Sequence, residues 1–181
     1  YFMSLEFLPG RFLKNYLTSL KMEEEARQVL SEMGFDLDEL EEEEWDAGLG
    51  NGGLGRLASC YMDSIACLDL PGYGYGIRYD YGIFHQIIEN GYQREQSDNW
   101  RRRGNPWEIQ RRDYLEPVRF FGRSETYRDD EGRLRYRWVD CEVVMAMACD
   151  ILIAGYGDDY VTNLRLWAAQ SSREFNLAHF N

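Results

Sequence analysis

Lysine is scarce in this sequence: only Lys14 and Lys21 occur among 181 residues, and the other eighteen of the 20 basic residues are arginines. An enzyme that holds a carbonyl compound as a Schiff base needs a lysine amine, so this chain offers two candidates for such a bond. Positive charge is scarce as well, since 32 acidic residues bring the net charge to −12. That balance argues against a general nucleic-acid-binding protein.

Long apolar runs and metal-binding motifs are also missing. No stretch approaches ~18 uninterrupted apolar residues, so we expect no membrane-spanning helix. Cys60, Cys67, Cys141 and Cys149 form no CxxC pair and have no histidine cluster beside them, which predicts free thiols in a reducing cytosol and no metal site. The chain has neither an initiator methionine nor a signal sequence, which predicts an internal excerpt of a longer, cytoplasmic protein.

Enough apolar material is present for a folded core, at 44% hydrophobic and 15% aromatic residues. Apolar residues recur at three- and four-residue steps from Leu13 to Met33, which predicts a helix with one buried stripe that ends at Gly34. A second helix is predicted to follow the glycines at 48–55. Its apolar stripe comprises Leu57, Tyr61, Ile65 and Leu68.

The second half of the chain has the alternating pattern of β-strands. Asn90-Gly91 and the run 129–132 are predicted to be hairpin turns. Strands are expected at 1–7, 73–79, 83–88, from 92 onward, and at 118–127, 134–139, 141–153 and 160–167. No linker or repeat separates these segments, so the sequence predicts no domain boundary.

The stretch from Asp36 to Asp46 contains eight acidic residues and no basic one. Leu37 and Leu40 leave room for a short helix inside it. The pattern favours a solvated acidic face over a metal or partner site.

Five glycines in eight positions, from Gly48 to Gly55, lead into the second helix. Consecutive glycines leave backbone N–H groups uncrowded, and the start of a helix adds unpaired N–H groups and the positive end of its dipole. These residues can therefore form an anion site regardless of net charge. The spacing alone leaves open a purely structural loop, in which glycine allows close helix packing. Arg56 can add a charged fork or pair with the acidic stretch.

The glycines also match the dinucleotide fingerprint GxGxxG as a string, at 48–53 and again at 50–55. The fingerprint requires a hydrophobic strand directly before it, and acidic residues stand there instead. No GK[ST] follows, which excludes a nucleotide P-loop.

Other candidates are weaker. His85 is interpreted as a half-buried strand histidine rather than a base, and Arg101–Arg103 as a surface turn whose charges offset nearby acids. Ser59 and Ser64 lack the elbow motif of a serine nucleophile. His179 lies too near the end of the sequence to interpret.

The run from Asp46 to Ala58 resembles the glycine-loop motif of the α-glucan phosphorylases, the glycogen, starch and maltodextrin phosphorylase family. Further motifs follow the family's order along essentially the whole chain. They lie at 4–7, 10–11, 74–79, 82–84, 105–108, 164–167, 175–177 and 180–181.

The resemblance implies phosphorolysis, in which inorganic phosphate cleaves the terminal α-1,4-glucosyl unit of a glucan and releases glucose 1-phosphate. It also implies an allosteric, homodimeric enzyme that depends on pyridoxal phosphate. By the same resemblance, Gly52, Gly53, Leu54 and Gly55 contribute backbone N–H groups near sugar and phosphate. Asn51 and Arg56 shape the loop.

Neither lysine of this chain matches the family's cofactor lysine, which belongs to the C-terminal domain, and no catalytic residue of the family falls within residues 1–181. The segment is therefore expected to be inactive alone. The implied fold is α/β: residues 1–181 are part of the N-terminal Rossmann-like domain of a two-domain, glycosyltransferase-B-type enzyme, with added β-hairpins. The residues leave two alternatives open, a nicotinamide-dependent oxidoreductase and a non-catalytic carbohydrate- or protein-binding domain.

Overall fold

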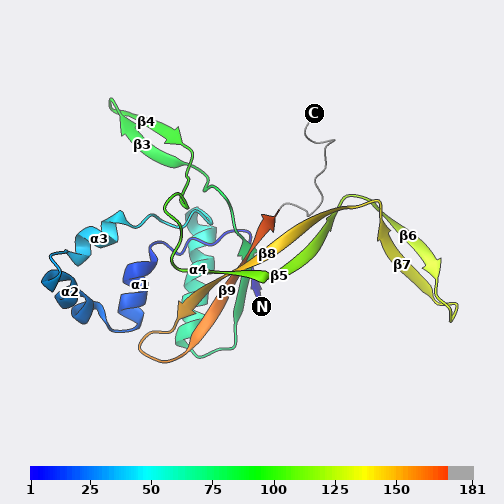
Figure 1. The fold of residues 1–181 in the computed structure, drawn as a ribbon, viewed down its shortest axis with the longest axis horizontal. Helices are drawn as coiled ribbons and strands as arrows, with labels where there is room; N and C mark the ends of the chain where they lie inside the picture. Colours follow the sequence, from blue (N-terminus) through cyan, green and yellow to red (C-terminus); the bar gives the residue numbers. More distant parts are fainter. Residues whose placement is uncertain (171–181) are drawn as a thin grey trace. The chain divides into compact units, whose positions relative to one another are not determined.

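A computed structural model describes residues 1–170 of the chain (Figure 1). The structure contains four helices and nine strands within these residues. The helices are α1 (Phe12–Ser19), α2 (Glu23–Glu32), α3 (Leu37–Glu43) and α4 (Gly52–Cys67). The strands are β1 (Phe2–Met3), β2 (Tyr73–Ile77), β3 (His85–Glu89), β4 (Tyr92–Gln96), β5 (Glu108–Phe120), β6 (Arg123–Arg128), β7 (Leu134–Val139), β8 (Glu142–Ala154) and β9 (Val161–Gln170). His179 and the motifs at 175–177 and 180–181 lie outside the described residues.

Five strands form a mixed sheet in the order β1-β2-β9-β8-β5. The β1, β2 and β9 strands pair in parallel, with Phe2 opposite Gly74 and Tyr73 opposite Asn163. A turn at residues 155–160 joins β8 to β9, and these two strands run in opposite directions (Figure 1). The mixed α/β class predicted from the sequence is confirmed. The Rossmann-like and glycosyltransferase-B assignments stay predictions.

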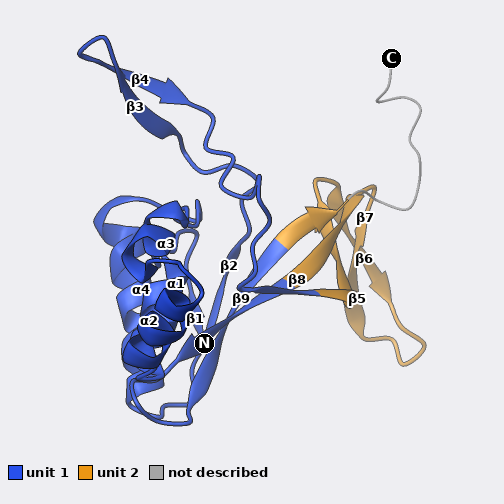
Figure 2. Ribbon diagram, turned by 60° about the vertical axis from the view of Figure 1, so that its left-hand side comes forward, with its two compact units in different colours: residues 1–110, 149–167 blue, residues 111–148, 168–181 orange. Residues whose placement is uncertain are grey.

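The chain divides into two compact units, although the sequence predicted no boundary (Figure 2). Unit 1 comprises Tyr1–Gln110 and Cys149–Trp167, and unit 2 comprises Arg111–Ala148 and, of the described residues that follow, 168–170. The division falls inside strands β5, β8 and β9. No linker separates the two units, so the sequence contains no linker-like composition that could mark the boundary. In unit 1 the helices lie on one side of β1, β2 and β9 (Figure 2).

Both predicted hairpins are confirmed, because β3 pairs antiparallel with β4 and β6 with β7. Asn90 and Gly91 both adopt positive φ (53° and 80°), the conformation of the two-residue turn that favours these residues. The predicted strand 118–127 is wrong as one element. The β5 strand ends at Phe120, and Phe121 and Gly122 turn the chain at positive φ before β6 begins.

The core of unit 1 lies between α4 and the sheet. Met62 and Ala66 of α4 are buried, as are Leu164 and Leu166 of β9. A Cβ atom on Gly74 would stand 2.9 Å from both the Met62 sulfur and Leu164 Cδ1. Glycine in β2 therefore allows the helix to pack closely against the sheet.

Two bidentate ion pairs in unit 1 have buried carboxylates. Arg165 Nε and Nη2 donate to the two oxygens of Asp150 at 2.8 and 3.0 Å, and Arg78 makes a bidentate pair with Glu108. Fork-shaped pairing satisfies the charges that burial has removed from water. Cys149, also in unit 1, is fully buried, and burial raises the pKa of its thiol to about 11. This thiol is therefore protonated at neutral pH.

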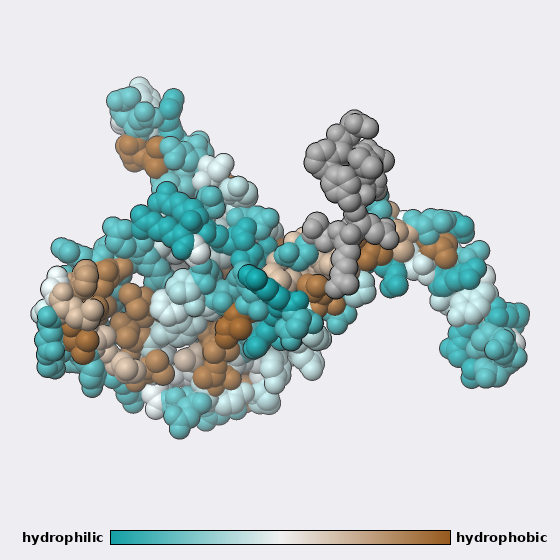
Figure 3. Space-filling model, viewed as in Figure 1, coloured by the Kyte–Doolittle hydropathy of each residue, from teal (hydrophilic) through white to brown (hydrophobic). Residues whose placement is uncertain are grey.

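The predicted stripe from Leu13 to Met33 is divided and largely unburied. The chain breaks into α1 and α2 where Lys21 adopts φ 55°, and α2 has no buried residue. Val29 and Met33 are 55% and 64% exposed, and Figure 3 shows apolar surface at this helical end of unit 1. The predicted stop at Gly34 is confirmed, since that residue has φ 85° directly after α2.

Candidate functional site

The glycine run enters α4 as the sequence predicted, since the helix begins at Gly52 with Asn51 as its N-cap residue. The preceding residues 44–51 form no strand. The strand that a dinucleotide fingerprint requires is therefore missing, and the oxidoreductase alternative loses its only support.

The first two glycines of the run are packed against other segments. A Cβ atom on Gly48 would lie 2.5 Å from Trp100 Cδ1 and 2.8 Å from the Gly82 Cα. A Cβ atom on Gly50 would lie 2.9 Å from the Phe7 amide nitrogen. Such distances leave no room for a side chain. Gly48 and Gly50 therefore fit the interpretation of a structural loop, in which glycine allows close packing.

The next two glycines are open. A Cβ atom on Gly52 or on Gly53 would meet nothing within 4 Å, and Leu54 is 67% exposed. Among residues 1–170, the structure shows no acceptor for the N–H groups of these three residues, and the Asn51 side chain does not cap them. Unpaired amides at a helix start carry partial positive charge and can bind an anion.

Three other residues of the loop, Gly55, Asn51 and Arg56, make hydrogen bonds to the segment Glu6–Pro9. Gly55 is buried, and its carbonyl accepts a hydrogen bond from the Leu8 amide at 2.9 Å. The Asn51 amide donates to Glu6 Oε2 at 3.2 Å. Arg56 Nη1 donates to the Leu8 and Pro9 carbonyls at 3.3 and 3.1 Å. Within the described residues, the open amides are therefore those of residues 52–54.

A cavity of about 190 Å³ lies beside the glycine run. Its lining includes Glu6, Tyr79 and Tyr81 together with Gly48 and Gly50. Carboxylate and phenol groups therefore stand next to the loop, where they can hydrogen-bond a polar ligand. Sequence reasoning missed Glu6 as a contact of the loop, because 45 residues separate it from Asn51 and no local pattern connects the two.

His85 lies at a second cavity near the loop, of about 430 Å³. It begins β3, as expected for a strand histidine, but it is exposed rather than half-buried, and its ring stacks on Trp45 at 4.9 Å between centroids. Asp98 lines the same cavity. Burial raises the pKa of Asp98 above its usual value, and the nearby His85 only partly opposes this increase.

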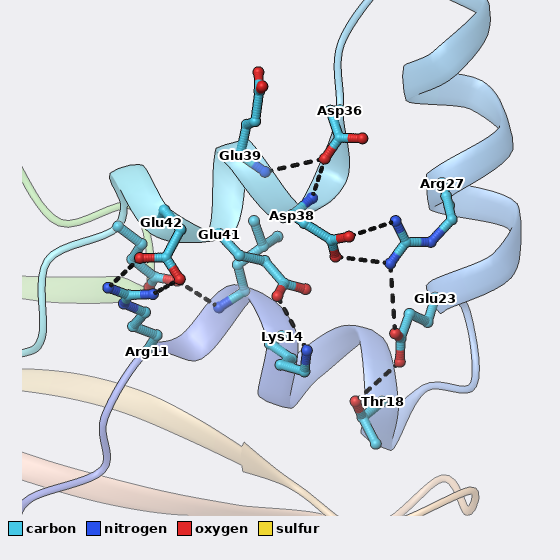
Figure 4. A network of polar contacts seen from close by, with 12 residues as sticks. Arg11, Lys14, Thr18, Glu23, Arg27, Asp36, Asp38, Glu39, Glu41 and Glu42 are labelled. Atoms are coloured by element: carbon cyan, nitrogen blue, oxygen red, sulfur yellow. Dashed lines mark hydrogen bonds and ion pairs between the residues drawn. The ribbon is translucent and has the colours of Figure 1, made fainter.

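Two acids of the stretch 36–46 pair with basic residues of α1 and α2, and Glu42 pairs with Arg11 just before α1 (Figure 4). Arg27 makes a bidentate contact with Asp38 at 2.9 and 3.2 Å, and Lys14 pairs with Glu41 at 3.2 Å. The expected short helix is present as α3, and the Asp36 side chain caps it. Within the described part of the chain, no group of acidic, histidine or cysteine side chains could hold a metal ion.

Glu44, at the end of this stretch, has a structural role that the sequence did not reveal. Its two carboxylate oxygens accept hydrogen bonds from the Phe12 and Leu13 amides, both at 2.9 Å, and its Oε1 also accepts one from Trp107 Nε1 at 2.7 Å. A carboxylate at a helix start satisfies unpaired N–H groups and complements the helix dipole. Glu44 therefore fixes the start of α1.

The arginine turn at 101–103 behaves as predicted. Arg101 pairs with Asp80, and Arg103 pairs with Glu43 at 3.0 Å. The Arg102 guanidinium lies 3.9 Å from the centroid of the Trp45 ring. These contacts confirm a surface turn whose charges offset nearby acids.

Both lysines make contacts with neighbouring side chains. The hydrogen bond from Lys14 to Glu41 raises the pKa of the lysine, whereas a Schiff base forms from the neutral amine. Lys21 lies 5.2 Å from the centroid of the Tyr156 ring.

Among residues 1–170, no helix is long and apolar enough to cross a membrane.

Comparison with known proteins gives consistent results. The family model for carbohydrate phosphorylases matches residues 30–181. The chain is 57% identical to a glycogen phosphorylase of Chlamydia pneumoniae and 52% identical to one of Chlamydia trachomatis. It is 50% identical to the brain form of glycogen phosphorylase from Bos taurus. Each alignment covers all 181 residues, and the chain spans 21–22% of the length of these relatives.

Proposed function

The chain belongs to the carbohydrate phosphorylase family, and from that membership we propose that it forms part of a glycogen phosphorylase. The enzyme cleaves terminal α-1,4-glucosyl units of a glucan with inorganic phosphate and releases glucose 1-phosphate. The observation that carries the proposal is the match over the full length of the chain to relatives named glycogen phosphorylase. The intact enzyme is proposed to be cytoplasmic and homodimeric, and residues 1–181 belong to its N-terminal Rossmann-like, glycosyltransferase-B-type domain.

In this proposal the open start of α4 binds the phosphate and sugar. The unpaired amides of Gly52, Gly53 and Leu54 support this role, because fixed N–H groups aimed at an anion stabilise the charge that develops during reaction. Gly55 is assigned the same role by the resemblance, and its burial makes it the least exposed of the four. Asn51 and Arg56 shape the loop through their bonds to Glu6 and to the Leu8 and Pro9 carbonyls.

The cofactor of the family, pyridoxal phosphate, supplies a phosphate group that relays a proton. By the resemblance, neither Lys14 nor Lys21 matches the family's cofactor lysine, which belongs to its C-terminal domain. We therefore place the cofactor lysine outside residues 1–181, and the segment alone is expected to be inactive.

The test is to replace Gly53 by valine in the natural polypeptide that carries this segment. The new side chain would stand in the open space before the amides, and kcat/KM for phosphate should fall by about 10²–10³-fold, as when one preorganised donor is lost. Ser64→Val serves as the matched control, since Ser64 is exposed on the same helix. Undiminished phosphorolysis by the Gly53→Val protein would remove the role proposed for the loop.

The same experiment decides the remaining alternative. A natural polypeptide that binds glucan and shows no phosphate-dependent release of glucose 1-phosphate would be a non-catalytic carbohydrate-binding protein. The exposed aromatic residues of unit 2, among them Tyr136 and Trp138, are the observation that keeps this alternative open.

A further inference from the structure

One short segment, Ser4–Leu8, holds the glycine run at three points. The Phe7 amide donates to the Leu49 carbonyl at 3.0 Å, and the Leu8 amide donates to the Gly55 carbonyl at 2.9 Å. Between these two bonds, the Asn51 amide donates to the Glu6 carboxylate at 3.2 Å. We call Ser4–Leu8 the anchor segment. It fixes the loop on both sides of the open amides.

The anchor segment is itself held in place. The Ser4 amide donates to the Tyr75 carbonyl of β2 at 3.1 Å, and the Tyr79 hydroxyl donates to the Leu5 carbonyl at 2.9 Å. Phe7 is 1% exposed. The loop is therefore positioned by a segment that is continuous with β1 and bonded to the end of β2.

The hydrogen bonds between the anchor segment and residues 48–55 are backbone to backbone, except at Glu6. A Cβ atom on Gly50 would lie within 3.0 Å of the Phe7 amide nitrogen and the Glu6 Cβ, and one on Gly55 would lie 3.4 Å from Leu8. Glu6 is half-buried, and a turn at Ser4 fixes its backbone, since the Glu6 amide donates to Ser4 Oγ at 3.2 Å. Its carboxylate is the only side chain of the segment that bonds the loop in the described structure.

Asn51 is the residue immediately before the three open amides. A carboxylate that accepts its N–H fixes the peptide plane at the start of the row, and the chain then turns through φ 56° at Gly52. From this arrangement we propose that Glu6 is a positioning residue for phosphorolysis: it accepts the Asn51 amide and thereby aims the amides of Gly52, Gly53 and Leu54 at the substrate phosphate. The inference rests on the proposed function, and its structural half can be measured separately.

The experiment compares Glu6→Ala, Glu6→Gln and Glu6→Asp in the natural polypeptide. Glu24→Gln is the matched control, because Glu24 is an exposed glutamate of α2. Glutamine keeps an acceptor oxygen at the same reach and removes the charge, whereas alanine removes the acceptor. Hydrogen exchange is followed in peptides that cover residues 48–55, and kcat and KM for inorganic phosphate are measured in parallel.

In the Glu6→Ala protein, amide exchange in residues 48–55 should accelerate on the order of tenfold, and kcat should fall by a similar factor, as expected for the loss of a charge-assisted hydrogen bond. The Glu6→Gln protein should stay within about threefold of the unmodified protein in both quantities. The Glu6→Asp protein, with a shorter arm, should fall between the two. The Glu24→Gln protein should not change.

Unchanged exchange in the Glu6→Ala protein would overturn the proposal. It would also be overturned by equal losses of kcat in the alanine and glutamine variants, because the negative charge rather than the acceptor would then matter. If the alanine variant does not fold, the comparison of Glu6→Gln with Glu6→Asp still shows whether the acceptor at its present reach or the negative charge matters. Absence of phosphorolysis in the unmodified polypeptide would refute the proposed function alone, since the exchange data report on the loop independently.

Discussion

The two halves of the glycine run use the same residue for opposite purposes. Gly48 and Gly50 are glycines because other atoms occupy the space where a Cβ would stand, whereas Gly52 and Gly53 face empty space. The first pair is enclosed by Trp100, Gly82 and the anchor segment. The second pair leaves its amides open. Glycine content alone therefore says little about function, and the surroundings of each Cβ position separate packing from binding.

The largest effect is expected from Gly48→Ala, which tests the packed half. The new methyl group would meet Trp100 and the Gly82 backbone at 2.5–2.8 Å, and overpacking of this kind costs about 3 kcal/mol. Exchange of the Phe7 amide, which is bonded to the Leu49 carbonyl, should accelerate by about 10²-fold. A Gly48→Ala protein with unchanged Phe7 exchange would show that the enclosure is not tight.

An intermediate effect is expected from Gly52→Ala, which separates backbone strain from lack of space. Nothing surrounds the new methyl group, but φ is 56°, and a left-handed conformation costs a non-glycine residue about 1–2 kcal/mol. Gly52→Asn should cost less, because asparagine tolerates this region. Equal melting temperatures for the alanine variant and the unmodified protein would refute the strain at this position.

A smaller effect is expected from Gly53→Ala, the matched partner of Gly48→Ala in the open half. The methyl group meets no atom and φ is not positive, so stability should rise by up to about 1 kcal/mol through lower entropy of the unfolded chain. Thermal unfolding measures the change. A loss of stability as large as that of Gly48→Ala would erase the distinction between the two halves.

The smallest effect is expected at Asp63, a half-buried residue in the second half of α4. Burial raises the pKa of Asp63 above its usual value of 3.8, and the charge of Arg56 partly opposes this. A folded-state pKa above the unfolded value lowers stability progressively as pH rises from about 3.8 through the folded pKa. Asp63→Asn should therefore raise the melting temperature slightly at pH 7, and the gain should disappear in acid. A gain that is constant across pH would argue against this shift.

The sequence predicted a helix after the glycines at 48–55, whereas α4 begins inside this run, at Gly52. Its predicted apolar stripe included Leu57, Tyr61 and Leu68, yet these residues are 51%, 49% and 66% exposed. The buried face comprises Gly55, Ala58, Ser59, Met62 and Ala66. Small residues lie against the sheet because they allow a close approach, and periodicity of large apolar residues cannot reveal a face made of small ones.

Local signals predicted both hairpin turns, missed the turn at Phe121 and Gly122, and could not predict distant contacts. Asn90-Gly91 predicted a hairpin because the turn conformation depends on those two residues alone. The contact between Glu6 and Asn51, and that between Glu44 and the start of α1, join residues 45 and about 30 positions apart in sequence. Such contacts depend on how the elements pack, so composition and spacing could not predict them.

The anchor segment has a mechanical consequence. Among the described residues it follows β1, which stands at the outer edge of the sheet. Its three hydrogen bonds to the loop connect that edge strand to the start of α4. A displacement of β1 along its own direction would therefore reach the residues beside Gly52 through these bonds.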